Sequence, residues 1–251
     1  MPVPAPLPSS LPVRFRARSA TRARASRLCS CAWAALVGFA CAAGFPGPGR
    51  AEELRGTVRL IERGAAVGDV GEALVWWVPE SGAGAAPPRR VDVNTERRQF
   101  SPRTLIVSPG STVRFPNADP IRHNVFSVST GNRFDLGLYG RGAGRSQTFQ
   151  RPGLVRIFCN VHRQMAAWVL VLETPFHATV AADGSFAVSG LPSGPGTLHV
   201  WHPRAAEWSR ALVLPAAPSI IELNAAHSAV PDHLNKFGRP YPETADDGSY
   251  R

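Results

Sequence analysis

Short apolar runs, each ended by a turn-forming residue, are the feature that most limits what this chain can fold into. The 251 residues include 24 Pro and 23 Gly, which interrupt the sequence too often for long helices or a coiled coil. Helical periodicity is almost absent, whereas runs such as 154–158 (LVRIF) and 168–172 (WVLVL) have the length and the β-branched and aromatic content of strands. The pattern predicts an all-β protein, and the strand spacing is typical of a sandwich.

The strand-like runs fall into two sets. Residues 52–90 are expected to supply two strands and a Gly-, Ala- and Pro-rich linker, and residues 174–226 are expected to supply further strands of the same set. Residues 91–173 hold a denser set, with predicted strands at 105–107, 112–115, 124–128, 147–149, 154–158 and 168–172. The last of these is apolar almost throughout, which is typical of a strand that is buried on both faces.

Three further segments carry specific predictions. Residues 131–145 contain five Gly and are expected to form a long loop. The dipeptide Asp183-Gly184, between two strand-like runs, predicts a β-hairpin. Residues 227–251 are polar and contain Pro, so we expect an extended C-terminal tail.

The N-terminal residues have the organisation of a secretory signal. An Arg-rich stretch, 14–28, precedes an apolar run, 31–43, that is too short for a comfortable membrane span. We expect residues 1–51 to be a signal peptide, with cleavage at 49–51 preferred over 40–42, and the exported chain to lie in the periplasm without a stable membrane span. An uncleaved membrane anchor is the alternative interpretation.

The net charge of +10 does not indicate a nucleic-acid partner, because most of the excess lies in the leader. Residues 1–51 hold seven Arg and no acidic residue, so the rest of the chain has 21 basic and 18 acidic residues. The remaining Arg residues lack the interleaved aromatic stripe or basic helix of a nucleic-acid surface. We therefore expect no nucleic-acid partner.

The strongest chemical signal is the run 159–165 (CNVHRQM), which lies between two strong predicted strands. Three of the four Cys lie in the leader, so Cys159 is the one that remains, and Met165 is the only Met besides Met1. His123 stands upstream at the start of another predicted strand. A lone thiol is a liability in an oxidising compartment unless something uses or protects it.

Two imidazoles, one thiolate and one thioether form the ligand combination of blue-copper sites, and here the candidates are His123, Cys159, His162 and Met165. Zinc would use the Cys and both His, but a thioether is an unusual zinc ligand and the nearby sequence lacks a fourth Cys or His. A Cys–His nucleophile is the catalytic alternative, yet no oxyanion site is marked. Four bound ligands leave no position for a substrate, so the set favours electron transfer by one copper ion, cycling between Cu(I) and Cu(II), over catalysis.

Together with 111–117 (STVRFPN) and 123–125 (HNV), this motif resembles the cupredoxin family, and its ligand-loop spacing is similar to that of amicyanins. The resemblance covers roughly residues 92–173. It implies a Greek-key sandwich in which His123, Cys159, His162 and Met165 bind copper. It also implies that Asn124 joins the two ligand loops by hydrogen bonds, and that the ring edge of His162 faces solvent as the port for electrons.

The expected docking rim departs from the family pattern. Arg163 and Gln164 stand where amicyanin-type loops carry a Pro and an aromatic residue, and Arg122 lies beside His123. A basic rim of this kind suits an acidic partner. The resemblance implies a redox protein partner such as a c-type cytochrome or a periplasmic dehydrogenase.

The flanking segments carry a second resemblance. The runs 72–77 (EALVWW), 183–186 (DGSF) and 190–192 (GLP) are similar to the small regulatory sandwich of carboxypeptidases, which is related to transthyretin. This resemblance implies a cupredoxin domain inserted in, or flanked by, such a sandwich. The whole layout resembles cupredoxin-type methylamine-utilisation proteins, which implies a periplasmic electron carrier.

Three hypotheses follow from these observations. The first is an exported type 1 copper protein that carries single electrons and is not an enzyme. The second is a copper-binding module for storage, delivery or sensing without electron transfer. The third is a purely structural β-sandwich.

Overall fold

Strands account for every long element of the structure, a computed structural model that describes residues 51–68 and 70–241. The one helical element among these residues is a 3-10 turn, Val70–Glu72. The all-β prediction is therefore confirmed. The described residues belong to one compact unit, 46–251, and none of their helices is long and apolar enough for a membrane span. Apart from Ala51, the predicted signal peptide lies outside the described residues.

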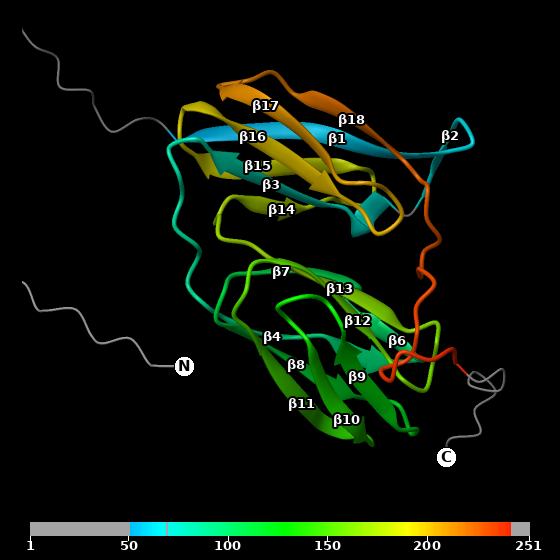
Figure 1. Cartoon of the computed structure of the whole chain (residues 1–251). Coiled ribbons are helices and arrows are strands. Elements are labelled where there is room, and N and C mark those ends of the chain that lie inside the picture. The colour runs from blue at the N-terminus through cyan, green and yellow to red at the C-terminus, as the bar shows by residue number, and fades with distance from the viewer. Residues whose placement is uncertain (1–50, 69, 242–251) are drawn as a thin grey trace, which may run out of the picture. The chain divides into compact units, whose positions relative to one another are not determined.

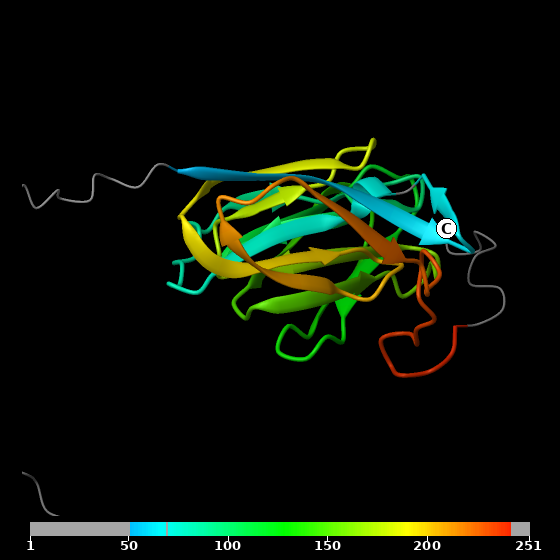
Figure 2. The same ribbon diagram turned by 90° about the horizontal axis from the view of Figure 1, so that it is seen from above.

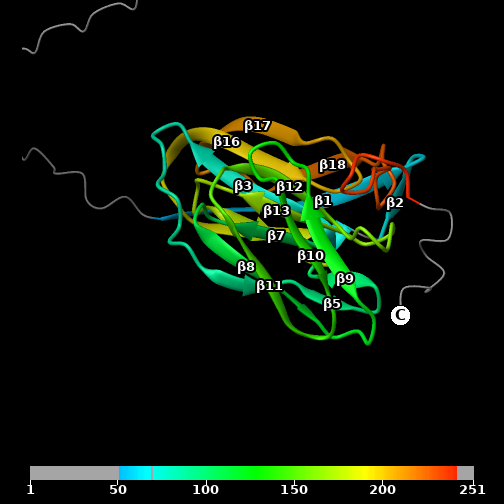
Figure 3. The same ribbon diagram turned by 60° about the horizontal axis from the view of Figure 1, so that its bottom comes forward.

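The central sandwich consists of strands β4 to β13 (Figure 1). One of its sheets has the order β10-β9-β12-β13-β7, and the other has the order β11-β8-β5-β6 with β4 paired to β8. Figure 3 shows β8 and β11 side by side as an antiparallel pair. The bounds are β4 Arg90–Asp92, β5 Asn94–Glu96, β6 Gln99–Ser101, β7 Thr104–Val107, β8 Ser111–Asn117, β9 His123–Ser127, β10 Phe134–Tyr139, β11 Gly142–Phe149, β12 Gly153–Phe158 and β13 Ala166–Val171.

Alternating side chains fill the space between the two sheets of the central sandwich. In β8, Val113 and Phe115 are fully buried while the residues between and beside them are more exposed, as the two-residue period of a strand requires. They share one core with Val155 and Ile157 of β12. Each fully buried side chain of this kind stabilises the fold by about 1.5–3 kcal/mol.

Strand β13 is buried on both faces, as its near-continuous apolar sequence predicted. Ala167 and Val169 belong to the core of the central sandwich. Trp168 and Leu170, which point to the opposite face, belong to a second cluster that includes residues of the flanking strands. The absence of alternation in the sequence therefore reports two packed faces.

The flanking sandwich is built from the strands that precede and follow the central sandwich in the chain (Figure 1). Its sheets have the orders β15-β1-β18, with β2 paired to β1, and β14-β3-β16-β17. The central sandwich thus lies between β3 and β14 in the sequence. The bounds are β1 Glu52–Glu62, β2 Ala65–Val67, β3 Leu74–Pro79, β14 His177–Thr179, β15 Ser185–Leu191, β16 Gly194–Trp201, β17 Trp208–Leu214 and β18 Ser219–Asn224.

A shared apolar cluster joins the two sandwiches. Its buried members are Leu74, Trp76, Ile106, Phe126, Phe158, Ala166, Trp168, Leu170, Leu172 and Trp201. The ring centroids of Trp168 and Trp201 lie 6.1 Å apart. At the edge of this cluster, Arg103 donates to Glu72 at 2.7 Å and lies over the ring of Trp168. These Trp residues therefore pack the interface between the sandwiches.

Residues 131–145 do not form the predicted long loop, because they contain β10 and the beginning of β11. The pairing register shifts between Asp135 and Leu138 and again between Gly142 and Arg145. Gly137 and Gly144 have φ values of 70° and 73° at these irregularities. The glycines therefore mark bulges inside strands, where a positive φ is needed, and not a loop.

The predicted Asp183-Gly184 hairpin is also wrong. The turn is present, with Gly184 N–H donating to Ala181 O at 2.9 Å. However, β14 pairs with β3 and β15 pairs with β1, so the turn connects two different sheets. A turn dipeptide determines a local change of direction, whereas the strand partner depends on the rest of the sheet.

The chain after β18 runs from the flanking sandwich to the central sandwich, coloured orange to red in Figure 1. We call residues 226–241 the C-terminal segment; Figure 2 shows its red end as a loop beside the strands. The sequence predicted an extended tail, and the segment has no helix or strand in its described part. It is nevertheless tied to the central sandwich by the side-chain contacts described below.

Candidate metal centre

The candidate ligands come from two places in one sheet of the central sandwich. His123 is the first residue of β9, and Cys159 directly follows β12, whose Phe158 pairs with Phe126 of β9. His162 lies in the loop between β12 and β13, and Met165 ends that loop. Because β9 and β12 are neighbours, residues 36 positions apart in sequence are brought together.

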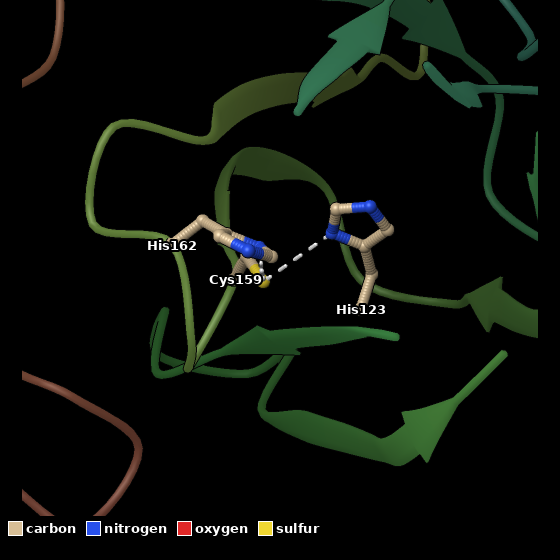
Figure 4. Close-up of side chains that lie close together, drawn as sticks. All are labelled: His123, Cys159 and His162. Carbon is tan, nitrogen blue, oxygen red and sulfur yellow. Dashed lines mark hydrogen bonds between the residues drawn. The ribbon is translucent and has the colours of Figure 1, made fainter. Parts of the chain in front are cut away.

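His123, Cys159 and His162 converge on one buried point (Figure 4). The Cys159 Sγ atom lies 4.0 Å from His123 Nδ1 and 3.6 Å from His162 Nδ1, and all three donor atoms lie within 4.8 Å of one another. The exposed fractions of the three residues are 0%, 0% and 2%. Three donor atoms are therefore gathered in a place that excludes bulk water.

These distances fit a single metal ion. Metal–nitrogen and metal–sulfur bonds of about 2.0 and 2.3 Å, at angles of about 110–120°, place nitrogen and sulfur about 3.6–3.8 Å apart. The donors are two imidazoles and one thiol, which are the ligand types that copper and zinc share. The separation of 3.6 Å between Cys159 and His162 lies in this range, and that of 4.0 Å between Cys159 and His123 is slightly longer. The residues therefore fit a copper ion in chemistry and come close to it in distance.

The ligand loop is closed by its own backbone. Cys159 N–H donates to Met165 O at 3.3 Å, and Met165 N–H donates to His162 O at 3.1 Å. Met165 is fully buried and belongs to the same apolar cluster as Cys159. Met165 is therefore bonded to Cys159 through the backbone and shares its core.

The far side of the His123 ring meets a carboxylate. His123 Nε2 lies 2.8 Å from Asp119 Oδ2, and Asp119 is 7% exposed. Burial lowers the pKa of His123, and the hydrogen bond with Asp119 offsets only part of that effect. Burial acts to raise the pKa of Asp119, but hydrogen bonds from the backbone N–H groups of Arg98 and Arg97, and from His123, lower it overall. Together these effects favour a neutral imidazole beside an ionised carboxylate.

Asn124 links the two places from which the ligands come. Its Oδ1 accepts a hydrogen bond from Asn160 N–H at 3.3 Å, and its Nδ2 donates to Asp135 Oδ1 at 2.7 Å. Lys236 closes a ring of polar contacts among these side chains. Its ammonium pairs with Asp135 at 2.7 Å, and its backbone N–H donates to Asn160 Oδ1 at 3.0 Å. This ring of contacts joins β9, β10, the ligand loop and the C-terminal segment.

His162 does not present its ring edge to solvent, contrary to the expectation from the family resemblance: the residue is 2% exposed. The C-terminal segment contacts the loop on both sides of it. Tyr241 Oη donates to Cys159 O at 2.9 Å, and Asp232 pairs with Arg163 at 2.9 Å. The physical reason for the difference is that β18 ends where the following residues can return across the ligand loop.

The segment also stacks on the strand that carries the thiol. The ring of His233 lies 3.9 Å from that of Phe158, nearly parallel to it, and 5.2 Å from that of Tyr241. Its Nδ1 lies 2.9 Å from Pro231 O. A cavity of about 920 Å³ opens on this side of the sheet, between the segment and residues that include Arg133 and Arg156.

The expected rim residues Arg122, Arg163 and Gln164 are all exposed. Arg163 is engaged by Asp232, so the rim is in part covered by the molecule's own acidic residue. Sequence reasoning missed the contacts that His233, Lys236 and Tyr241 make at the site.

Asp119 was also missed. A signal for it existed, because it precedes His123 by four residues in a Pro-flanked turn and metal-binding histidines commonly donate their second nitrogen to a carboxylate. For the C-terminal segment no comparable signal exists, since a polar run with two prolines is typical of a solvated tail.

Comparison with known proteins gave similarity to solved structures only. No protein-family model and no curated protein matches the sequence. A purple cupredoxin from Nitrosopumilus maritimus is similar at 20% identity over 33% of this chain and 99% of its own, with a TM-score of 0.30. A Cu(I) structure of an amicyanin mutant is similar at 22% identity over 33% of this chain and 82% of its own, with a TM-score of 0.32.

A third similar structure is the copper-containing nitrite reductase from Thermus scotoductus SA-01, at 25% identity over 45% of this chain and 28% of its own, with a TM-score of 0.33. These three solved structures are thus a purple cupredoxin, an amicyanin and a copper-containing nitrite reductase.

Proposed function

We propose that the central sandwich is a type 1 copper domain, and that the exported chain carries single electrons between redox partners in the periplasm without catalysing a reaction. The observation that carries this proposal is the convergence of His123, Cys159 and His162 on one buried point. Thiolate and imidazole donors without a carboxylate at the ligand positions favour copper over hard cations. Copper bound there would supply a one-electron Cu(I)/Cu(II) couple.

The protein residues have separate roles in this proposal. The Nδ1 atoms of His123 and His162 and the thiolate of Cys159 would be the three strong ligands of a copper ion, and Met165 would be a weak fourth ligand. The backbone hydrogen bonds that close the loop hold these donors in place, so little rearrangement accompanies a change of charge. Four ligands leave no position for a substrate, which favours electron transfer over catalysis.

The exposed basic rim supports an acidic redox partner. Arg122 and Arg163 lie next to the ligands His123 and His162 in sequence and are solvent-exposed. Complementary charges on a partner such as a c-type cytochrome or a periplasmic dehydrogenase would raise the association rate at low salt. The electron-exchange rate is then expected to fall as salt is added.

A copper module for storage, delivery or sensing is the second candidate, and the burial of His162 favours it. An electron carrier needs a ligand edge close to its partner, whereas a storage site needs shielding from solvent and competing ligands. The C-terminal segment, which contacts both Cys159 O and Arg163, supplies such shielding. The two candidates therefore differ in whether electrons pass while the segment is in place.

The test is a visible absorption spectrum of residues 52–251 after one equivalent of Cu(II) is added. An intense thiolate-to-copper band that bleaches with reductant and returns with oxidant supports the type 1 site. Copper bound with only a pale spectrum means that Cys159 is not a ligand and favours storage or delivery. No stoichiometric binding leaves a structural β-sandwich. Stopped-flow mixing of the coloured protein with a reduced c-type cytochrome then separates carrier from storage.

A further inference from the structure

The two nitrogens of the His123 ring face different partners. Nδ1 lies 4.0 Å from Cys159 Sγ, on the side where the candidate donors converge, and Nε2 lies 2.8 Å from Asp119 Oδ2. Figure 4 shows the Nδ1 edge turned toward Cys159 and the second ring nitrogen turned away. An ionised carboxylate only accepts hydrogen bonds, so Nε2 must carry the proton and the lone pair of Nδ1 is free for a metal.

Asp119 is itself held by two consecutive backbone donors. Arg97 N–H donates to Oδ1 at 2.7 Å and Arg98 N–H donates to Oδ2 at 2.9 Å, both from the turn between β5 and β6. The two Arg residues have φ values of 54° and 58°, in the left-handed region that non-glycine residues rarely adopt. Asp119 N–H also donates to Asn117 Oδ1 at 2.9 Å. Such successive amide donors form an anion-binding turn.

The two backbone donors favour the charged form of Asp119 over the neutral one. The two-residue loop of the β5–β6 hairpin, a connection that favours positive φ, directs both of its N–H groups at the carboxylate in charge-assisted hydrogen bonds. Asp119 is buried and His123 is fully buried, so solvent screens the pair little. The negative charge therefore acts on the imidazole at short range.

We propose that Asp119 is a positioning residue for the candidate copper site: it fixes His123 in the tautomer that presents Nδ1, and its charge stabilises Cu(II) relative to Cu(I). This inference rests on the proposed copper function. A carboxylate on the second nitrogen makes an imidazole a more basic ligand, which favours the higher charge on the metal. The reduction potential of the site is accordingly lower than it would be with a neutral acceptor at residue 119.

A purely structural role for Asp119 makes a different prediction. If the carboxylate only braces the turn at residues 117–121, its replacement lowers stability and leaves the reduction potential of the folded protein unchanged. The reduction potential therefore separates the two roles. The tautomer of His123 in the metal-free protein supplies a second criterion that needs no variant.

The experiment compares the copper-loaded parent with Asp119→Asn, which keeps an oxygen acceptor but removes the charge. We expect the variant to bind Cu(II) about 10- to 100-fold more weakly, with Cu(I) affinity less affected. Each factor of ten in this difference raises the reduction potential by about 59 mV. Asp92→Asn is the matched control: it removes a carboxylate that pairs with Arg114 on the surface, and should leave the potential unchanged.

The outcomes are distinguishable. A parent protein without a thiolate-to-copper band refutes the proposed function. A coloured parent whose potential and Cu(II) affinity are unchanged in Asp119→Asn refutes the inference alone. If the variant does not fold, nitrogen-15 NMR of the metal-free parent decides: a proton on Nε2 of His123 and none on Nδ1 supports the inference, and the opposite tautomer overturns it.

Discussion

The two imidazole ligands of the candidate site are held in opposite ways. His123 is fixed by residues of the central sandwich: Asp119 lies four residues before it, and the donors to Asp119 lie 21 and 22 residues before that carboxylate. The loop of His162 is contacted by Asp232, Lys236 and Tyr241, which lie 69, 76 and 82 residues after their partners. One ligand is thus positioned within the central sandwich, and the other is covered from outside it.

The flanking sandwich contributes to the site by positioning the C-terminal segment. Between the ligand loop and the C-terminal segment, the chain passes through β14 to β18 of that sandwich. Strand β18 pairs in parallel with β1, and the next residues bond to Arg204 before the C-terminal segment reaches the site. The flanking strands therefore determine where the C-terminal segment begins, although none of them supplies a candidate ligand.

The exposed ion pair of the C-terminal segment is also weaker than the hydrogen bonds that hold Asp119 behind His123. The Arg163–Asp232 pair has side-chain exposures of 49% and 97%, and such exposed pairs contribute about 0–1 kcal/mol. The bonds to Asp119, by contrast, are buried or part-buried and charge-assisted, and hydrogen bonds to charged groups contribute about 1.5–3 kcal/mol each. We therefore expect the His162 side of the site to open while the His123 side stays closed.

The largest expected effect is on the visible spectrum and comes from replacing Cys159, the thiol toward which both histidines point. Cys159→Ser removes the thiolate, so the intense visible band should disappear even if the two histidines still bind Cu(II). Absorption spectra of parent and variant at equal copper loading measure this change. Retained far-ultraviolet circular dichroism is the control for folding, and a variant that stays blue is incompatible with Cys159 as a ligand.

Imidazole rescue sharpens the comparison between the two histidines. In His162→Gly, free imidazole should enter once the C-terminal segment moves aside, and should restore most of the visible band. In His123→Gly, the vacated space lies inside the sandwich against Asp119, so we expect little or no recovery at the same imidazole concentration. Titrations followed by absorbance test this, and equal recovery in both variants would remove the asymmetry.

Removal of the C-terminal segment tests the cover directly. The three polar contacts that the segment makes with the ligand loop, at about 1 kcal/mol each, correspond to roughly a 100-fold change in the opening equilibrium. A chain that ends at Val230 should therefore lose copper to a chelator up to about 100-fold faster than the parent while keeping its visible band.

A chain that ends at Tyr241 is the matched control, because it keeps every described contact of the segment. It should release copper at the rate of the parent. Equal rates for the chains ending at 230 and at 241 would show that the segment does not limit access to the site.

The smallest effect concerns pH. Burial lowers the pKa of His233 in the C-terminal segment and that of His123 at the start of β9. A histidine whose pKa is lower in the folded state binds more protons when unfolded, so its stabilisation is present above an unfolded pKa of about 6.5 and is lost as the pH falls below it. The free energy of unfolding of the metal-free protein should therefore decrease below about pH 6.5.

His233→Phe keeps a ring on Phe158 but removes one of these titrations. Its unfolding free energy should depend less steeply on pH than that of the parent. The number of protons taken up on unfolding should be smaller by at most one per molecule. Urea unfolding at pH 7 and at pH 5 measures the difference. His177, whose pKa is also lowered by burial, contributes equally to both proteins.

Several features could be read from local sequence. The two-residue period of β8 and the apolar run of β13 predicted buried strands, and both are present. Cys159, His162 and Met165 were recognisable as one candidate site because they share a single loop. Local patterns succeeded where neighbouring residues alone determine the outcome.

The errors lie where one pattern serves two structures. Gly137 and Gly144 read as loop residues but lie at bulges, because a positive φ is required in both settings. The Asp183-Gly184 turn was identified, yet its strands pair with β3 and β1. A turn sequence does not contain the identity of a strand's partner.

The amino-acid sequence by itself determined the all-β class, the ligand loop and the chemistry of its donors, since periodicity and side-chain type are properties of residues close together in the chain. Only the tertiary structure decided that β9 lies beside β12, that the turn at Arg97 and Arg98 holds the carboxylate behind His123, and that the C-terminal segment covers the loop of His162. The physical reason is that these contacts join residues that are distant in sequence. Their proximity depends on the order of the strands in the sheets and on where β18 ends, and no local pattern records either.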